Sequence, residues 1–160
     1  MITIKQNEKR QLQRLAAQRQ LYSTAKRIFG WQMFFSGLLT VILAFFVVFD
    51  PSLKTLAVSW GIFITLIDFF WLTPLQNSLK DSAAKIQEMF DCDVLELPWN
   101  DLKADTHPDP DPELIKEQSE KYEKNLLKGA RLENWYDHLE ISDLLLNVER
   151  IAWQISNFWW

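Results

Sequence analysis

One stretch of the sequence constrains the fold more than any other feature: residues 31–49 (WQMFFSGLLTVILAFFVVF) contain no charged side chain. At about 1.5 Å per residue, a helix of this length spans about 28 Å, close to the roughly 30 Å hydrocarbon core of a bilayer. A second apolar run, 56–72, carries a single charge, Asp68. Such runs are typical of transmembrane helices, although a buried helix pair in a soluble domain is an alternative interpretation.

The two apolar runs are joined by the short segment DPSLK, which begins at Asp50. An aspartate followed by Pro51 is a typical helix start, because the carboxylate caps free amides and proline needs no amide partner in the first turn. So short a link forces the two helices to run antiparallel as neighbours. The sequence therefore predicts an all-α membrane protein, with a two-helix transmembrane hairpin (31–49 and 56–72) and amphipathic cytoplasmic helices.

The charges predict how this hairpin is oriented. Residues 1–30 contain seven Lys and Arg residues and one acid, only Lys54 lies in the turn, and from Thr73 onward acids outnumber bases by about two to one. A basic arm suggests nucleic-acid binding in some proteins. Here it leads directly into an apolar segment, so we interpret it as a topology signal and expect no DNA partner. By the positive-inside rule, both termini are cytoplasmic and the turn is outside.

Both predicted spans carry small or hydroxyl-bearing residues at a spacing of about four. These are Ser36, Thr40 and Ala44 in the first span and Ala57, Gly61 and Thr65 in the second. Small residues at this spacing let helix backbones approach closely in lipid. Packing within the hairpin explains the pattern, and so does a role in oligomerisation or in lining a pore.

Asp68 is the most informative single residue of the second span. A carboxylate in a membrane is costly and marks a candidate functional group. Asp68 also lies about one helical turn from the expected cytoplasmic end, where water hydrates polar groups. An interfacial anchor or structural hydrogen bond is one interpretation, and a role in an ion path or in gating is the other.

Helices are also predicted on both sides of the hairpin. Residues 1–30 form a basic cytoplasmic segment with an apolar stripe, and 73–160 form an acidic cytoplasmic helical region. The stripe of the first comprises Leu12, Leu15, Tyr22, Ala25 and Phe29, and that of the helix after the second span comprises Leu75, Leu79, Ala83, Ile86 and Phe90. Two such helices leaving a hairpin side by side bury their stripes against each other.

Three further boundaries follow from local signals. Thr73-Pro74 is typical of a cap and first turn, so a new helix is expected to begin there. The segment 91–100 interrupts the apolar pattern and is expected to be a structured connection. Pro112 is expected to open another helix, which ends near Gly129.

Catalytic chemistry is not indicated anywhere in the chain. His107 and His138 are isolated, Cys92 is the only cysteine, and four glycines leave little scope for a phosphate-binding loop. The acidic, proline-rich segment around His107 lacks the glycine and the spacing of a calcium loop. The sequence therefore predicts no enzyme, no catalytic or metal-binding residue and no cofactor.

Several motifs resemble one family. They are LAAQRQLY at 15–22, IQEMFD at 86–91, VLELPWN at 94–100, Trp135-Tyr136, and QISN at 154–157 followed by Trp159-Trp160. Together they resemble the SMODS-associating four-transmembrane (S-4TM) family of pore-forming effectors, along essentially the whole chain. Members of that family are longer and have four spans. By this resemblance the chain corresponds to an N-terminal half, cut or shortened before a second transmembrane pair.

The resemblance implies a role in bacterial antiphage defence by abortive infection. A neighbouring synthase makes a cyclic oligonucleotide on infection, and the effector responds by assembling as a homo-oligomer or opening in the inner membrane. If such a ligand binds, Arg131 beside Trp135 and Tyr136 is a candidate contact, because cations and aromatic rings bind phosphates and bases. A membrane-anchored interaction module with no pore of its own is the competing function.

Overall fold

The computed structural model of the chain describes residues 2–97, 111–125, 132, 133 and 135. All regular secondary structure in these residues is helical. The acidic, proline-rich segment around His107 and most of the predicted helical region after Asn125 lie outside the described residues. The chain divides into two compact units, one formed by Arg19–Ala83 and the other by Met1–Gln18 with Ala84–Trp160.

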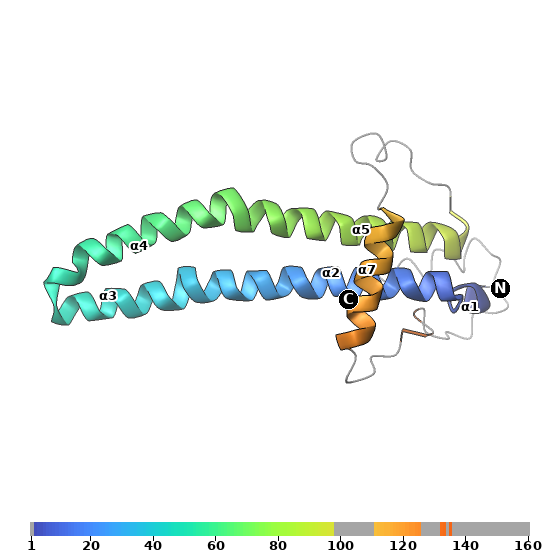
Figure 1. Cartoon of the computed structure of the whole chain (residues 1–160), viewed down its shortest axis with the longest axis horizontal. Coiled ribbons are helices and arrows are strands. Elements are labelled where there is room, and N and C mark those ends of the chain that lie inside the picture. The colour runs from blue at the N-terminus through green and yellow to red at the C-terminus, as the bar shows by residue number, and fades with distance from the viewer. Residues whose placement is uncertain (1, 98–110, 126–131, 134, 136–160) are drawn as a thin grey trace. The chain divides into compact units, whose positions relative to one another are not determined.

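The first unit contains a helical hairpin. Its outgoing helix, which enters this unit at Arg19, comprises α2 (Lys9–Met33), the π-helical turn η1 (Phe34–Leu38) and α3 (Leu39–Phe49). Its returning helix comprises the 3-10 turn η2 (Pro51–Leu53), α4 (Lys54–Ile67), the π-helical turn η3 (Asp68–Leu72) and α5 (Thr73–Leu95). Figure 1 shows α3 and α4 side by side, joined by the short turn. Both continuous helices, Lys9–Phe49 and Pro51–Leu95, are long and apolar enough to cross a membrane.

The predicted cap at the hairpin turn is present. Asp50 has an extended backbone (φ −132°, ψ 95°), and its Oδ1 accepts a hydrogen bond from the backbone N–H of Ser52 at 2.9 Å. Hydrogen bonding by Ser52 holds the pKa of Asp50 below its ordinary value. Pro51 occupies the first turn, where its missing N–H costs nothing.

Helix α5 begins at Thr73, as predicted, but it continues the π-helical turn η3 without a break, so Thr73 does not cap a separate helix. The amide of Thr73 bonds to the carbonyl of Asp68, five residues back, which defines η3. Proline lacks an N–H and its ring crowds the preceding turn. A wider π turn placed immediately before Pro74 accommodates both effects, so the helix continues instead of ending.

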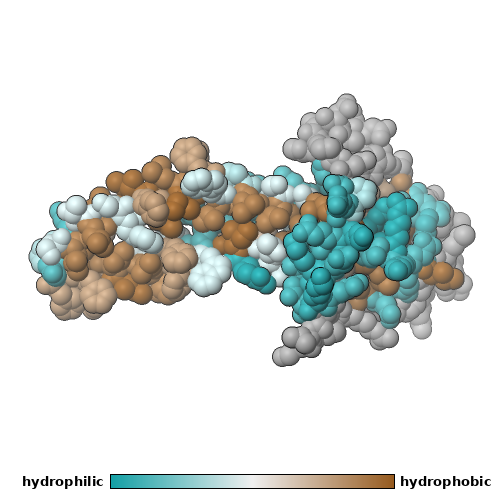
Figure 2. Space-filling model, in the orientation of Figure 1, coloured by the Kyte–Doolittle hydropathy of each residue, from teal (hydrophilic) through white to brown (hydrophobic). Residues whose placement is uncertain are grey.

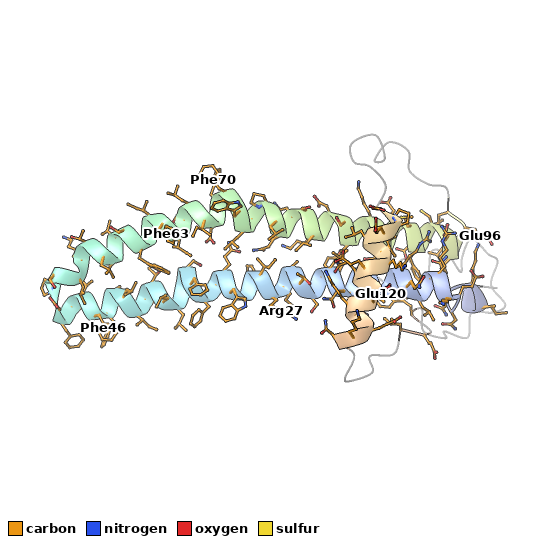
Figure 3. All side chains as sticks on the ribbon, viewed as in Figure 1. Arg27, Phe46, Phe63, Phe70, Glu96 and Glu120 are labelled. Atoms are coloured by element: carbon orange, nitrogen blue, oxygen red, sulfur yellow. The ribbon has the colours of Figure 1, made fainter. Side chains whose placement is uncertain are left out.

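The apolar side chains of the hairpin are displayed rather than buried. None of the most apolar window of the first helix is buried within the chain, and only 6% of that of the second. Figure 2 shows hydrophobic side chains covering α3 and α4, and in Figure 3 Phe46 and Phe70 point away from the hairpin. A helix pair in the core of a soluble domain buries such residues, so this exposure argues against that alternative.

The second unit contains α1 (Ile2–Lys5), the start of α2, the end of α5 and α7 (Pro112–Asn125). Its apolar core comprises Leu15, Phe90, Val94 and Leu95, with Leu97, Leu132 and Trp135 packed against it. The opening of α7 at Pro112 confirms the prediction, and the Asp111 carboxylate caps the amide of Glu113 at 2.9 Å. The predicted end of this helix near Gly129 lies outside the described residues.

The helix α5 extends one turn further than its sequence pattern indicated, to Leu95. It then ends in a Schellman motif, in which the amide of Leu97 bonds to the carbonyl of Cys92 at 3.0 Å and Glu96 adopts a left-handed conformation (φ 55°). Because Leu97 packs against the core, this cap also closes the apolar cluster. The predicted break at 91 was therefore early by about one turn.

The predicted apolar stripe of α2 is only partly buried. Leu15 and Ala25 are buried, but Tyr22 and Phe29 are exposed. Four polar residues of α2 are also buried, and three of them, Gln11, Arg14 and Gln18, lie along one stripe. The inward face of the helix is therefore rotated from the apolar stripe towards this polar stripe. On α5 the predicted Ala83, Ile86 and Phe90 are buried, whereas Leu75 is exposed.

Candidate functional site

The hydroxyl groups of two candidate residues bond within their own helices. Ser36 Oγ donates to the carbonyl of Gln32 at 2.7 Å, and Thr65 Oγ1 donates to the carbonyl of Gly61 at 2.7 Å. Bonds of this kind satisfy the hydroxyl and bend the helix slightly. Neither group therefore needs a partner from the facing helix.

Gly61 does not mark a close approach of the two backbones. A Cβ placed there has no heavy atom within 4 Å, and Thr65 one turn later is exposed. Ala57, at the start of the same ridge, is half-buried. Packing within the hairpin therefore does not require a glycine at position 61. The alternative, a face for another helix or for a pore, stays a prediction.

Three polar atoms in the hairpin are buried without a hydrogen-bond partner among the described residues: Thr40 Oγ1, Trp60 Nε1 and Asp68 Oδ1. Leaving such an atom unsatisfied costs about 1–3 kcal/mol, and more for a charged group. The Trp60 ring lies 6.5 Å from the ring of Phe35 and 6.2 Å from that of Phe63, measured between centroids. These rings surround the indole with apolar contacts but offer its N–H no acceptor.

Thr40 and Asp68 occupy corresponding sequence positions relative to one side-chain bond that joins the two helices. The side-chain amide of Gln76 donates to the side-chain oxygen of Gln32, which fixes the register of the two helices at this point. Thr40 and Asp68 each lie eight residues closer to the turn than their member of this pair. One π turn intervenes on each helix, so the two paths are matched. We call Thr40, Trp60 and Asp68 the polar triad of the hairpin.

Sequence reasoning identified Thr40 and Asp68 but missed Trp60, both π turns and the Gln32–Gln76 bond. A tryptophan in an apolar run is typical of lipid-facing surface, so nothing in the sequence marked its N–H. The Ser36-Gly37 pair and Pro74 were available signals for the π turns, because helices distort at such residues. π turns are frequent at functional sites, so the two π turns are a second reason to consider the residues near them as candidates.

A second polar cluster lies in the other unit. The guanidinium of Arg14, whose side chain is 4% exposed, donates through Nη1 to Gln11 Oε1 at 3.1 Å, to the carbonyl of Met89 at 3.2 Å and to Asp93 Oδ2. Gln11 also donates to Asp93 Oδ2, at 3.3 Å. Burial raises the pKa of Asp93, but the bonds from Arg14 and Gln11 and the charge of Arg14 outweigh it, so the pKa lies below its ordinary value. This ion pair joins α2 to α5.

The predicted ligand contacts are only partly described. Trp135 packs against the apolar core of Leu15, Phe90 and Leu95. Arg131 and Tyr136 lie outside the described residues. A ligand-binding role for these three residues stays a prediction.

Fold and site together define a class: a protein that is helical throughout its described secondary structure, with two long apolar helices that could span a membrane and that carry buried polar atoms without a described partner. The chain belongs to the family of SMODS-associating 4TM effector domains, which matches residues 1–160.

The chain is also similar to a protein of Bacillus cereus (strain VD146) described as a probable CBASS effector molecule. The two are 26% identical over 162 residues, which cover 98% of this chain and 52% of that relative. The chain thus spans about half the length of the relative. No solved structure matches the chain.

Proposed function

We propose that the chain is the membrane-inserted part of a CBASS antiphage effector that disrupts the bacterial inner membrane when a cyclic oligonucleotide is made on infection. Membership of a family of 4TM effector domains and the similarity to a Bacillus protein described as a probable CBASS effector molecule support this proposal. Because the chain spans half of that relative, the activity is proposed for the complete protein. No catalytic step is assigned to the chain.

The observation that carries the proposal is the polar triad. Hydrocarbon contains no water to replace a missing hydrogen-bond partner. Each of these unpaired polar atoms therefore destabilises the hairpin before the signal arrives. Assembly of several copies, or separation of α3 from α4, gives these atoms partners or water. The helices can therefore rearrange without breaking hydrogen bonds of these three side chains. After the rearrangement, the same side chains line a polar path.

The orientation is tested by labelling single cysteines. In a Cys92→Ser background, Ser52→Cys in the turn and Ser23→Cys in α2 are both exposed positions. Because seven bases precede the first span, we expect a membrane-impermeant maleimide to label Ser52→Cys on intact cells, and Ser23→Cys only after lysis. The reverse pattern would place the termini outside and contradict the proposed topology.

The proposed activity is tested by co-expressing the complete protein with its cyclic-oligonucleotide synthase and following membrane potential with a voltage-sensitive dye. We expect depolarisation that depends on the synthase. Asp68→Asn removes the charge of the triad while preserving its shape, and we expect it to reduce the rate of depolarisation about tenfold or more, since an intramembrane charge costs several kcal/mol and is retained for a role. Asp81→Asn, an exposed carboxylate of α5 outside the predicted span, is the matched control.

A membrane-anchored interaction module is the second candidate. The hydroxyls of Ser36 and Thr65 bond within their own helices, which leaves fewer groups to line a path. In that case membrane potential stays intact at saturating signal, Asp68→Asn has no effect, and crosslinking recovers a stable protein partner. If the wild type depolarises the membrane and Asp68→Asn does not, the result supports the membrane-disrupting effector over the interaction module.

A further inference from the structure

A cavity of about 180 Å³ lies among α2, α5 and α7 in the unit that holds the Arg14–Asp93 pair. Its lining includes Arg10, Gln13 and Arg14 of α2, Met89 of α5, and Ile115 and Lys116 of α7. Three of its lining residues are bases, and no acid is among them. A larger cavity nearby, bordered by Lys9, Glu123 and Glu133, has mixed charge. The smaller cavity is therefore the one suited to an anion.

The positive charges at the cavity are available to a ligand. Arg10 and Lys116 are exposed, and within residues 2–97 and 111–125 no ion pair or side-chain hydrogen bond holds either of them. Arg14 makes its bonds to Gln11, Met89 and Asp93 through Nη1 alone, so its other N–H groups have no acceptor among the described residues. A guanidinium has five N–H donors in a planar fork, which matches phosphate geometry.

The arrangement also leaves an electrostatic imbalance. Arg10 and Arg14 are one helical turn apart on the same face of α2, where like charges repel. Asp93 accepts from Arg14 and thereby compensates one positive charge. Asp93 also attracts Arg10, so one carboxylate faces three bases, and the net positive charge that is left favours an anion between α2 and α7. The Asp111 carboxylate is engaged in capping α7 and is not part of the cavity lining.

We infer that this cavity binds a phosphodiester group of a cyclic oligonucleotide. The inference rests on the proposed function and deepens it by locating the signal. Arg10 and Lys116 hold the phosphate oxygens, Arg14 forms the floor, and Gln13 hydrogen-bonds the adjoining sugar or base. Met89 and Ile115 supply apolar contact. A cavity of this volume admits one phosphodiester and its neighbouring sugar, and the rest of the ligand extends outside it.

Binding there joins α7 to α2 through a shared anion. Because α2 continues through η1 into α3, a ligand held by Arg10 acts on the same continuous helix that carries Thr40. The ligand thereby changes the packing near the start of the continuous helix Lys9–Phe49, and the same helix carries Thr40 of the polar triad further along. This is a physical route from signal to hairpin that needs no additional domain.

The test measures binding of cyclic di-AMP, cyclic di-GMP, cyclic UMP-AMP and cyclic tri-AMP to the full chain in non-ionic detergent, by equilibrium dialysis. Arg10→Ala and Lys116→Ala remove exposed side chains and preserve the core. Each is expected to weaken binding of the recognised nucleotide about tenfold, the size of one charge-assisted hydrogen bond. Lys124→Ala, an exposed base of α7 outside the cavity lining, should bind as the wild type does.

Binding equal in all variants, or no binding of any of the four nucleotides, overturns the inference. A phospholipid headgroup carries the same phosphodiester chemistry, so nanodiscs of phosphatidylglycerol form a second arm. If phosphatidylglycerol binds in an Arg10- and Lys116-dependent way and no nucleotide does, the cavity is a lipid site and the inference fails.

The inference and the proposed function fail in different ways. If Arg10→Ala and Lys116→Ala leave depolarisation unchanged, the cavity is not the ligand site, but the proposed membrane-disrupting function still holds. If both variants lose nucleotide binding but the wild type causes no depolarisation, the cavity is the ligand site and the proposed membrane-disrupting function is wrong.

Discussion

Replacement of Phe90 by alanine will lower the free energy of unfolding of the helix pair α2–α5 by about 3–5 kcal/mol, the usual cost of removing a buried phenyl ring. Phe90 has no exposed surface and lies in a cluster with Leu15, Val94 and Leu95. The cluster is small, so its neighbours have little surrounding structure with which to fill the cavity. The ring also supports Trp135, which packs on the same cluster.

Hydrogen exchange of the amides of residues 84–95 in detergent measures this effect, because their protection reports the opening free energy of the helix pair. Phe46→Ala in α3 is the matched control. The Phe46 ring is 52% exposed and points away from the hairpin (Figure 3), so its removal should leave protection at 84–95 within about 0.5 kcal/mol of the wild type. Equal effects of the two substitutions would mean that the Phe90 cluster is not a core.

Replacement of Asp93 by alanine will destabilise the same unit by about 1–3 kcal/mol, because the buried guanidinium of Arg14 loses its carboxylate partner. The figure is smaller than for a fully buried pair, since the Asp93 side chain is 43% exposed and solvent screens its charge. Arg14→Met fills the buried volume without the charge. The double variant Arg14→Met, Asp93→Ala should therefore recover part of the stability lost in Asp93→Ala.

The same pair predicts a dependence on pH. The pKa of Asp93 is below its ordinary value in the folded chain, so its contribution is fully present above the unfolded value of about 3.9 and is lost as pH falls through the lowered folded pKa. Thermal unfolding in detergent should show an acid-induced loss of stability below about pH 4 that is smaller in Asp93→Asn. A wild type and variant with the same pH dependence, or additive single substitutions, would contradict a coupled pair.

Features with a local cause were predictable from the sequence. The uncharged run 31–49 and the short link after it gave a hairpin of two long helices. Asp50-Pro51 gave the cap at the turn, and Pro112 gave the start of α7. Each of these depends on chemistry within a few residues of the position predicted.

Features set by tertiary packing were not predictable in the same way. The inward face of α2 includes Arg14 and Gln18, although apolar periodicity favoured Tyr22 and Phe29. Arg14 is tolerated inside because α5 supplies Asp93 and the carbonyl of Met89 from far along the chain, and Gln87 bonds Gln18 at 2.8 Å. A single sequence does not show which residues far apart in the chain contact each other, so these partners of Arg14 and Gln18 could not be predicted. For the same reason two of the three triad residues were identified from the sequence and Trp60 was missed, since the surroundings of Trp60 include Phe35 on the facing helix.

The π turns have a mechanical meaning. A π turn holds one residue more than an α turn, and in an α helix one residue corresponds to a rotation of about 100°. If the surplus residue migrates along the helix, every side chain that it passes swings to a new azimuth while the backbone ladder stays bonded. Thr40 lies two residues after the end of η1 and Asp68 is the first residue of η3, so they are among the first side chains to turn. Each of the two long helices thus contains one π turn, and we expect a shift of either π turn to change which side chains face inward while the helix stays hydrogen-bonded.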